Sequence, residues 1–307
     1  MFNLKSASIS CVALLGATAS WAAPFMQGDV FAAVSNGKVQ HYDKNLNLIE
    51  TLDTGLGGYT TGMCFDKNGN LYVSGFSASQ VSVFSKATGA LTGTFGSGYS
   101  IPESVLFDKT GNFYSSSVGG LGIQKFDSTG VQTATYALGR TDWIDLSADQ
   151  STMYYTTETT SVAVLDLGTN TVTGSIALPG LGLSYALRLL GTSQLLVAQS
   201  NQIDLMNLDG TVANTYAVSG QSSFFALNLD PNGTSFWSGD FSTGEFFKFD
   251  IATGTVLAQT NTNTGNYTLF GLAVEGEKTQ GGPPPSTPAP AALLSFVLPL
   301  LRRRKKA

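Results

Sequence analysis

A short phrase recurs along this chain at intervals of about forty residues, and it constrains the fold more than any other feature. The segments FDKNGNLYVSG, FDKTGNFYSSS and LDPNGTSFWSG begin at Phe65, Phe107 and Leu229. Each runs from an apolar residue through Asp and a Gly-containing turn into a second apolar stretch, which predicts a β-hairpin. The next strand of each unit ends at a position that recurs every 39 to 43 residues: Asp43, Ser85, Asp127, Asp166, Asn207 and Asp250. The chain therefore contains six repeats.

A period of roughly 40 to 50 residues built from short alternating strands is typical of a β-propeller, whose blades are four-stranded antiparallel sheets. No segment has the apolar spacing of a helix, and Thr, Val, Tyr, Phe and Gly are abundant. The first unit, residues 29 to 53, lacks the strand that opens the later units, whereas FGLAVEG at 270 to 276 is such a strand with nothing following it. We therefore expect an all-β, six-bladed propeller, closed by the C-terminal strand completing the first blade, which leaves no unpaired sheet edge.

Both ends of the chain have the composition of processing signals. Residues 1–23 carry Lys5, the apolar run CVALLGA and SWAA before Pro24, which predicts a secretory signal peptide. The propeller is expected over residues 24–277, followed by a Pro-rich linker at 278–290 and a hydrophobic and basic C-terminal segment at 291–307. Removal of the signal peptide leaves Cys64 as the only cysteine, so an intramolecular disulfide is excluded.

The C-terminal segment combines a Pro-containing motif, the apolar run AALLSFVLPLL and the cluster RRRKKA. This order resembles the PEP-CTERM sorting signals that exosortases of Gram-negative bacteria recognise, with Pro288, Ala289 and Pro290 in place of Pro-Glu-Pro. The resemblance implies an exosortase-like processing enzyme, membrane contact before processing, and a final location in the periplasm, on the outer surface or in the extracellular matrix. The alternative is a weak C-terminal membrane anchor that is retained.

The repeat itself also resembles a known group. DKNGNLYV and DKTGNFY are similar to the turn and second strand of NHL-type repeats and of the related SMP-30/gluconolactonase and YVTN-type propellers, and Pro102, Glu103 and Ser104 resemble their Pro-x-Gly lead. The enzymes of that group share a metal site of Glu, Asn and Asp side chains on the central axis. The resemblance supports the fold more than any one function.

Charge and residue type exclude several functions. Residues 24–277 contain nine basic and 21 acidic residues, a balance of 9 − 21 = −12, so nucleic acid is excluded as a partner. Asp66, Asp108 and Asp230 each precede a Gly by three residues, which predicts a structural turn and no calcium loop. His41 is the only histidine and is expected to be solvated or at the edge of the core, so His-dependent catalysis and His or Cys metal sites are excluded.

Alignment of the innermost strand across the blades gives the candidate site. The aligned positions are Thr61, Glu103, Trp143, Tyr185, Phe225 and Phe270, and small residues such as Gly62 and Gly271 follow them. We predict a ligand site at one mouth of the channel formed by Glu103, Asp142, Trp143, Tyr185 and Phe225, near the loops that carry Tyr59, Tyr99 and Arg140. Aromatic faces with a few polar groups suit a carbohydrate or peptide ligand. The alternative is that the rings only fill the space between blades.

These features favour a non-catalytic binding or scaffold module of the cell envelope or exopolysaccharide layer, and no metal or cofactor is expected. The aligned positions contain a single carboxylate, Glu103, and Asp142 lies one residue outside the alignment. This departs from the lactonase pattern of several oxygen ligands. The competing hypothesis is a lactonase-like or lyase-like hydrolase that uses Glu103 and Asp142 with a divalent metal at the central channel.

Overall fold

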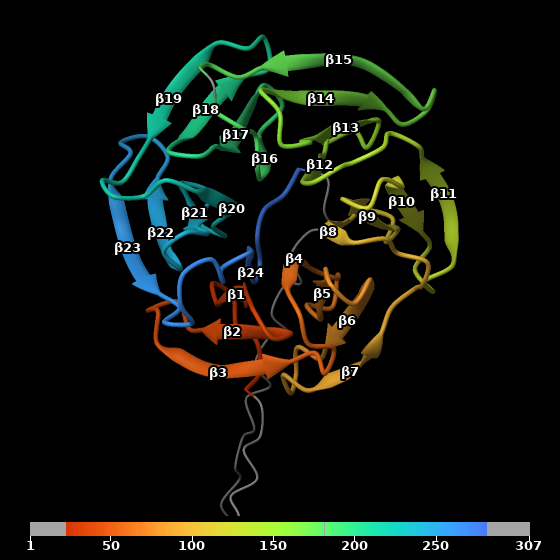
Figure 1. Ribbon diagram of the computed structural model, residues 1–307, viewed down its shortest axis with the longest axis vertical. Coiled ribbons are helices and arrows are strands. Elements are labelled where there is room, and N and C mark those ends of the chain that lie inside the picture. The colour runs from red at the N-terminus through yellow and green to blue at the C-terminus, as the bar shows by residue number, and fades with distance from the viewer. Residues whose placement is uncertain (1–22, 181, 281–307) are drawn as a thin grey trace, which may run out of the picture.

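A computed structural model describes residues 23–180 and 182–280 of the chain, so the expected signal peptide, except its last residue, and most of the C-terminal linker and sorting segment lie outside the described residues. The described residues form six four-stranded antiparallel sheets arranged in a ring around a central axis (Figure 1). This is the six-bladed propeller that the repeat predicts.

The first blade is closed by strands from both ends of the described chain, as predicted. It comprises β24 (Gly271–Val274), β1 (Val30–Val34), β2 (Lys38–Tyr42) and β3 (Leu48–Asp53). Val30 pairs with Val274, and Ala33 pairs with Gly271. Closure of the ring therefore depends on a short strand that lies more than two hundred residues from its partner.

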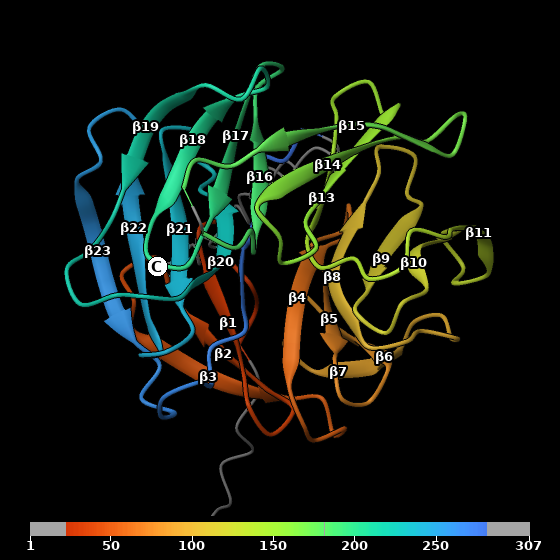
Figure 2. The same ribbon diagram turned by 45° about the horizontal axis from the view of Figure 1, so that its top comes forward.

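The other five blades follow one another in sequence, each running from an innermost to an outermost strand (Figure 2). Blades 2 and 3 contain β4 (Thr60–Phe65), β5 (Leu71–Gly75), β6 (Gln80–Phe84), β7 (Leu91–Thr94), β8 (Pro102–Phe107), β9 (Phe113–Ser117), β10 (Gly122–Phe126) and β11 (Gln132–Tyr136). Blade 4 contains β12 (Ile144–Leu146), β13 (Thr152–Tyr155), β14 (Ser161–Asp166) and β15 (Thr171–Ala177). Blades 5 and 6 contain β16 (Leu187–Leu190), β17 (Gln194–Ala198), β18 (Ile203–Asn207), β19 (Val212–Tyr216), β20 (Phe224–Leu229), β21 (Ser235–Asp240), β22 (Glu245–Asp250) and β23 (Val256–Asn261).

Local chemistry explains why the repeats fold alike. The Asp66 carboxylate accepts the backbone N–H groups of Asn68 and Asn70 at 2.8 and 2.9 Å, and Gly69 has a φ of +81°. Asp108 makes the same contacts in blade 3, so the predicted structural turn is confirmed. All six blades also carry a shift of register between their third and fourth strands. Such a bulge increases the twist of the outer edge of each blade.

The hydrophobic core lies between neighbouring blades. The largest cluster joins blades 4, 5 and 6, where the rings of Phe236 and Phe249 stack with centroids 5.1 Å apart. Innermost strands such as β24 are buried along their whole length, whereas the outermost strand β7 is exposed. Burying one large apolar side chain contributes about 1.5 to 3 kcal/mol, so this packing holds the ring without a disulfide.

His41 departs from the sequence-based expectation, because it is fully buried. Its Nε2 lies 2.9 Å from an Asp29 carboxylate oxygen, and its Nδ1 lies 3.2 Å from Glu50. The imidazole also stacks on Phe31 with a centroid distance of 4.4 Å. The two acids give this polar ring hydrogen-bond partners inside the first blade, which is why the core accepts it.

No helix found within residues 23–180 and 182–280 has the length and apolar character needed to cross a bilayer.

Candidate functional site

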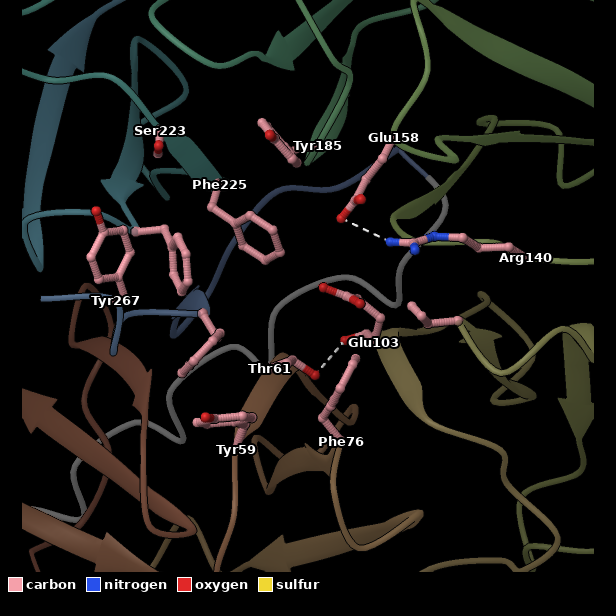
Figure 3. Close-up of a pocket in the computed structure, with 13 residues that line it drawn as sticks. Tyr59, Thr61, Phe76, Glu103, Arg140, Glu158, Tyr185, Ser223, Phe225 and Tyr267 are labelled. Carbon is pink, nitrogen blue, oxygen red and sulfur yellow. Dashed lines mark hydrogen bonds and ion pairs between the residues drawn. The ribbon is translucent and has the colours of Figure 1, made fainter.

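A cavity of about 440 Å³ opens at the end of the channel where the innermost strands begin, which we call the upper mouth (Figure 3). Its volume lies in the range of small-molecule binding sites. The residues that line it are Tyr59, Thr61, Phe76, Glu103, Val118, Arg140, Glu158, Tyr185, Ser223, Phe225, Phe241, Tyr267 and Phe270. Five of the six aligned positions are therefore at the cavity.

Close approach of the innermost strands fixes the positions of these side chains. A Cβ atom on Gly62 would lie 2.2 Å from the Glu103 carbonyl oxygen, and one on Gly271 would lie 2.1 Å from the carbonyl oxygen of Thr61. Only glycine allows backbones to approach so closely. The small residues found beside the aligned positions thus allow the innermost strands to lie close together around the axis.

Hydroxyl groups at the ends of the second strands of blades 2, 3 and 4 each link that blade to the next one. The Ser74 hydroxyl donates to the Glu103 carbonyl at 3.1 Å, and the Thr156 hydroxyl donates to the Tyr185 carbonyl at 2.6 Å. Ser116 makes the corresponding bond to the carbonyl of Asp142. The sequence analysis missed these residues, although a Ser or Thr recurs at this point of β5, of β9 and directly after β13. These buried bonds hold the backbone of the cavity wall in place.

The register of blade 4 corrects the placement of Trp143. Thr156 pairs with Trp143 as Ala198 pairs with Ala186, so Trp143 occupies the small-residue position and Asp142 is the equivalent of Tyr185. Successive residues of a strand point to opposite faces, so a slip of one residue moves the side chain away from the channel. Trp143 is accordingly 2% exposed within the core between blades 4, 5 and 6.

A constant spacing in the sequence identifies the correct register. Thr61, Glu103 and Phe225 each precede the first residue of their hairpin turn by five residues, namely Asp66, Asp108 and Asp230. In blade 4 the equivalent turn begins at Ser147, and counting back five residues leads to Asp142. The substitution of Ser for Asp in this turn concealed the signal.

One side of the cavity is charged. Arg140 donates to both carboxylate oxygens of Asp142, from Nε at 3.0 and 3.3 Å, and its Nη2 lies 2.8 Å from Glu158. Glu103 is 4% exposed, and none of the described residues donates a hydrogen bond to its carboxylate. Burial, together with the charges of Asp142 and Glu158, raises the pKa of Glu103 to about 8, although Arg140 opposes the shift. Burial likewise raises the pKa of Asp142 to about 6, against the effect of Arg140.

The other side of the cavity is aromatic. Tyr185 and Phe225 lie with centroids 5.3 Å apart, and Phe225 contacts Phe241 at 5.8 Å. Phe241 in turn contacts both Tyr267 and Phe270, at 5.3 and 5.2 Å. The rings thus form a continuous wall opposite Glu103 and Arg140, as Figure 3 shows.

The five predicted site residues therefore have different positions. Glu103, Tyr185 and Phe225 line the cavity, Asp142 contacts it through Arg140, and Trp143 does not reach it. Of the loop residues, Tyr59 and Arg140 line the cavity, whereas Tyr99 packs against Phe126 and donates its hydroxyl hydrogen to the Phe95 carbonyl. Whether these residues bind a ligand stays a prediction.

The opposite end of the channel, the lower end, is crossed by the chain after β24 (Figure 1). The buried Arg188 Nε donates to Glu277 at 2.9 Å, and Glu277 also accepts the N–H of Leu229 and the amide of Asn228, at 2.7 and 2.9 Å. Asp145 accepts the N–H of Leu189 at 2.7 Å. Burial raises the pKa of Asp145 to about 6, opposed by the charge of Arg188. Sequence analysis did not find this network, which joins residues far apart in the chain.

Comparison of this chain with known proteins gives information about its fold only. No protein-family model matches the sequence, and no curated protein matches it significantly. Among solved structures, a chain of the "Crystal structure of Nidogen/Laminin Complex" is similar, with a TM-score of 0.65 and 15% sequence identity over 80% of this chain and 97% of that chain. In the part of the chain that the structure describes, no three His, Cys, Asp or Glu residues are placed to hold a metal ion.

Proposed function

We propose that the chain is an exported, surface-sorted β-propeller that acts as a non-catalytic binding or scaffold module of the cell envelope or exopolysaccharide layer. The signal-peptide pattern of residues 1–23 supports export. The resemblance of residues 288–307 to PEP-CTERM signals supports processing by an exosortase-like enzyme at the membrane. The resemblance of the repeat to NHL-type and SMP-30/gluconolactonase propellers supports the propeller fold of this module and no single activity.

A carbohydrate or peptide ligand binds in the upper mouth. The observation that carries this proposal is the aromatic wall together with Tyr59, whose ring centroid lies 4.5 Å from that of Phe270. Beside the cavity, Tyr267 remains 61% exposed and Tyr59 45% exposed. Exposed rings that face a cavity lose water favourably when a sugar or peptide group stacks on them. The protein of the nidogen and laminin complex gives a precedent for a similar chain in a complex of two proteins.

Glycan and peptide arrays probed with the mature exported protein test the binding function. A ligand of the upper mouth should bind Tyr267→Ala about tenfold or more weakly, because stacking on the ring is lost. Val172→Ala on β15 is the matched control, since Val172 is also exposed but lies on an outermost strand. Array ligands that bind the two variants equally well would exclude the upper mouth as their site.

Sorting is tested separately on the native protein. An enzyme that recognises the Pro motif, the apolar run and the basic cluster together should cut before or within the apolar run. Mass spectrometry of the mature surface protein is therefore expected to find no peptide ending in RRRKKA. Recovery of that peptide from the native protein would favour a retained anchor.

The second candidate is a lactonase-like or lyase-like metal-dependent hydrolase. The observation that favours it is the Glu103 carboxyl, whose pKa of about 8 keeps it protonated at neutral pH and able to act as a general acid. Against it, Arg140 already pairs with Asp142, the carboxylate that would have to hold the metal while Glu103 acts as the acid. An activity that a chelator abolishes and a divalent cation restores would favour the hydrolase, whereas ligand binding insensitive to chelation would favour the binding module.

A further inference from the structure

The charges around the upper mouth do not balance. Glu103, Asp142 and Glu158 face a single basic side chain, Arg140, and among the described residues no other Lys, Arg or His lines the cavity. When all three acids are ionised, their sum with Arg140 is 1 − 3 = −2. Arg140 is already held by two of the acids, through Nη2 contacts of 2.8 Å to both Asp142 and Glu158. Glu103 is thus the acid left without a cation.

The environment of Glu103 is unfavourable for a carboxylate in the absence of a ligand. It is nine-tenths or more buried, receives no hydrogen bond from the described residues, and lies near the acids Asp142 and Glu158, whose effect on it exceeds that of Arg140. A buried carboxylate without a partner is costly, and a cation at hydrogen-bond distance removes that cost. The cavity lies directly beside it (Figure 3).

The opposite wall suits the same kind of ligand. Tyr185, Phe225 and Phe241 form a continuous set of rings across the cavity from Glu103. The faces of aromatic rings attract organic cations, and they also bury an apolar body. A neutral sugar would use the rings but leave the charge of the acids unbalanced, and an anion would be repelled by it.

We propose that the upper mouth binds an organic ammonium ligand, with its positive nitrogen at Glu103 and its apolar body against the aromatic wall. This rests on the proposed binding function and narrows its ligand to amine-bearing compounds. Binding ionises Glu103, so the carboxyl releases its proton to the solvent when the ammonium group arrives. The charged groups that face Glu103 in this state are Asp142, Glu158 and Arg140.

The test uses three probes of similar shape on the mature protein: 2-phenylethylammonium, the neutral 2-phenylethanol and the anionic 3-phenylpropionate. Isothermal titration calorimetry at pH 7 should show that the amine binds at least tenfold more tightly than either control. In buffers with different ionisation enthalpies, the heats should reveal release of up to one proton for each amine bound. Glu103→Gln should lose about tenfold in amine affinity and most of the proton release, while its affinity for the alcohol stays unchanged.

Two further variants make the result decisive. Glu158→Gln should weaken amine binding less than Glu103→Gln, because Arg140 already partners Glu158. Asp209→Asn, in the exposed turn after β18, should leave both affinity and proton release unchanged. Equal affinity for all three probes, or amine binding that Glu103→Gln does not weaken, would overturn the ammonium proposal. That outcome would not contradict the wider binding function. The binding function fails only if no array ligand binds more weakly to Tyr267→Ala.

Discussion

Each end of the channel contains a buried carboxyl group, and the two groups differ in their hydrogen-bond partners. At the lower end, Glu277 accepts three hydrogen bonds, from Arg188, Asn228 and Leu229. At the upper mouth, Glu103 receives none from the described residues and lies beside an open cavity. A buried charge that is fully partnered belongs to the structure, whereas one without a partner destabilises the fold and is available to a ligand.

The largest expected effect follows from removing the lower-end segment together with β24. Ending the chain at Gly265 leaves the first blade three-stranded and exposes the edge of β1, where Val30 now pairs with Val274. Loss of this strand and of Glu277 should cost more than about 5 kcal/mol and abolish cooperative unfolding. Thermal unfolding followed by circular dichroism measures this. A truncated protein with the midpoint and sharpness of the longer form would contradict closure by β24.

Breaking the lower-end ion pair alone should have the next largest effect. Arg188→Met leaves Glu277 and Asp145 buried without their cation, at an expected cost of about 3 to 5 kcal/mol in the free energy of unfolding. Urea denaturation at pH 7 measures it. Lys38→Met is the control, because the Lys38 and Asp53 pair is exposed and should contribute less than about 1 kcal/mol. Equal effects of the two variants would show that the lower network is not structural.

Trp143 lies close to the binding site but belongs to the hydrophobic core. Its side chain is enclosed in the core between blades 4, 5 and 6, so Trp143→Ala should cost about 3 to 5 kcal/mol of folding stability. Ligand affinity at the upper mouth should stay unchanged in the fraction that folds. If Trp143→Ala instead has near-normal stability and weakened ligand binding, Trp143 is part of the binding site at the upper mouth.

The fold was predictable because its determinants are local and repeated. The turn at Asp66 and Gly69 recurs in blade after blade, and the unpaired strand at 270 to 276 was complementary to an incomplete first unit. The site was predictable only in part. Glu103, Tyr185 and Phe225 followed from alignment, but blade 4 begins its turn with Ser147, and a slip of one residue there exchanged Asp142 for Trp143.

Contacts between distant parts of the chain left no pattern in the sequence. Arg188 and Glu277 lie 89 residues apart, and neither belongs to a recurring motif. The burial of His41 depends on Asp29 and Glu50, which lie on either side of it in the first blade and are not spaced as a motif. The first contact depends on the closure of the ring and the second on the register of neighbouring strands in one blade, and neither follows from a residue pattern.

The pH dependence of stability tests the contrast between the two ends most directly. The pKa of Glu103 is raised to about 8 from its usual 4.5, so the folded state keeps a proton that the unfolded state loses. The stabilising effect of that proton is complete below pH 4.5 and is lost as the pH rises toward 8. The glutamine of Glu103→Gln does not titrate, so the free energy of unfolding of the variant should rise relative to that of the wild type as the pH rises.

The measurement is urea denaturation of wild type and Glu103→Gln at pH 4.5 and pH 8.5. One pKa unit corresponds to about 1.4 kcal/mol of unfolding free energy, and water in the cavity reduces this value. Between these two pH values, the stability of the variant relative to the wild type should therefore increase by about 2 to 3 kcal/mol. Asp209→Asn, on an exposed turn, should show no such gain. If Glu103→Gln is instead destabilised equally at both pH values, Glu103 is a partnered structural acid like Glu277, and the contrast between the two ends is wrong.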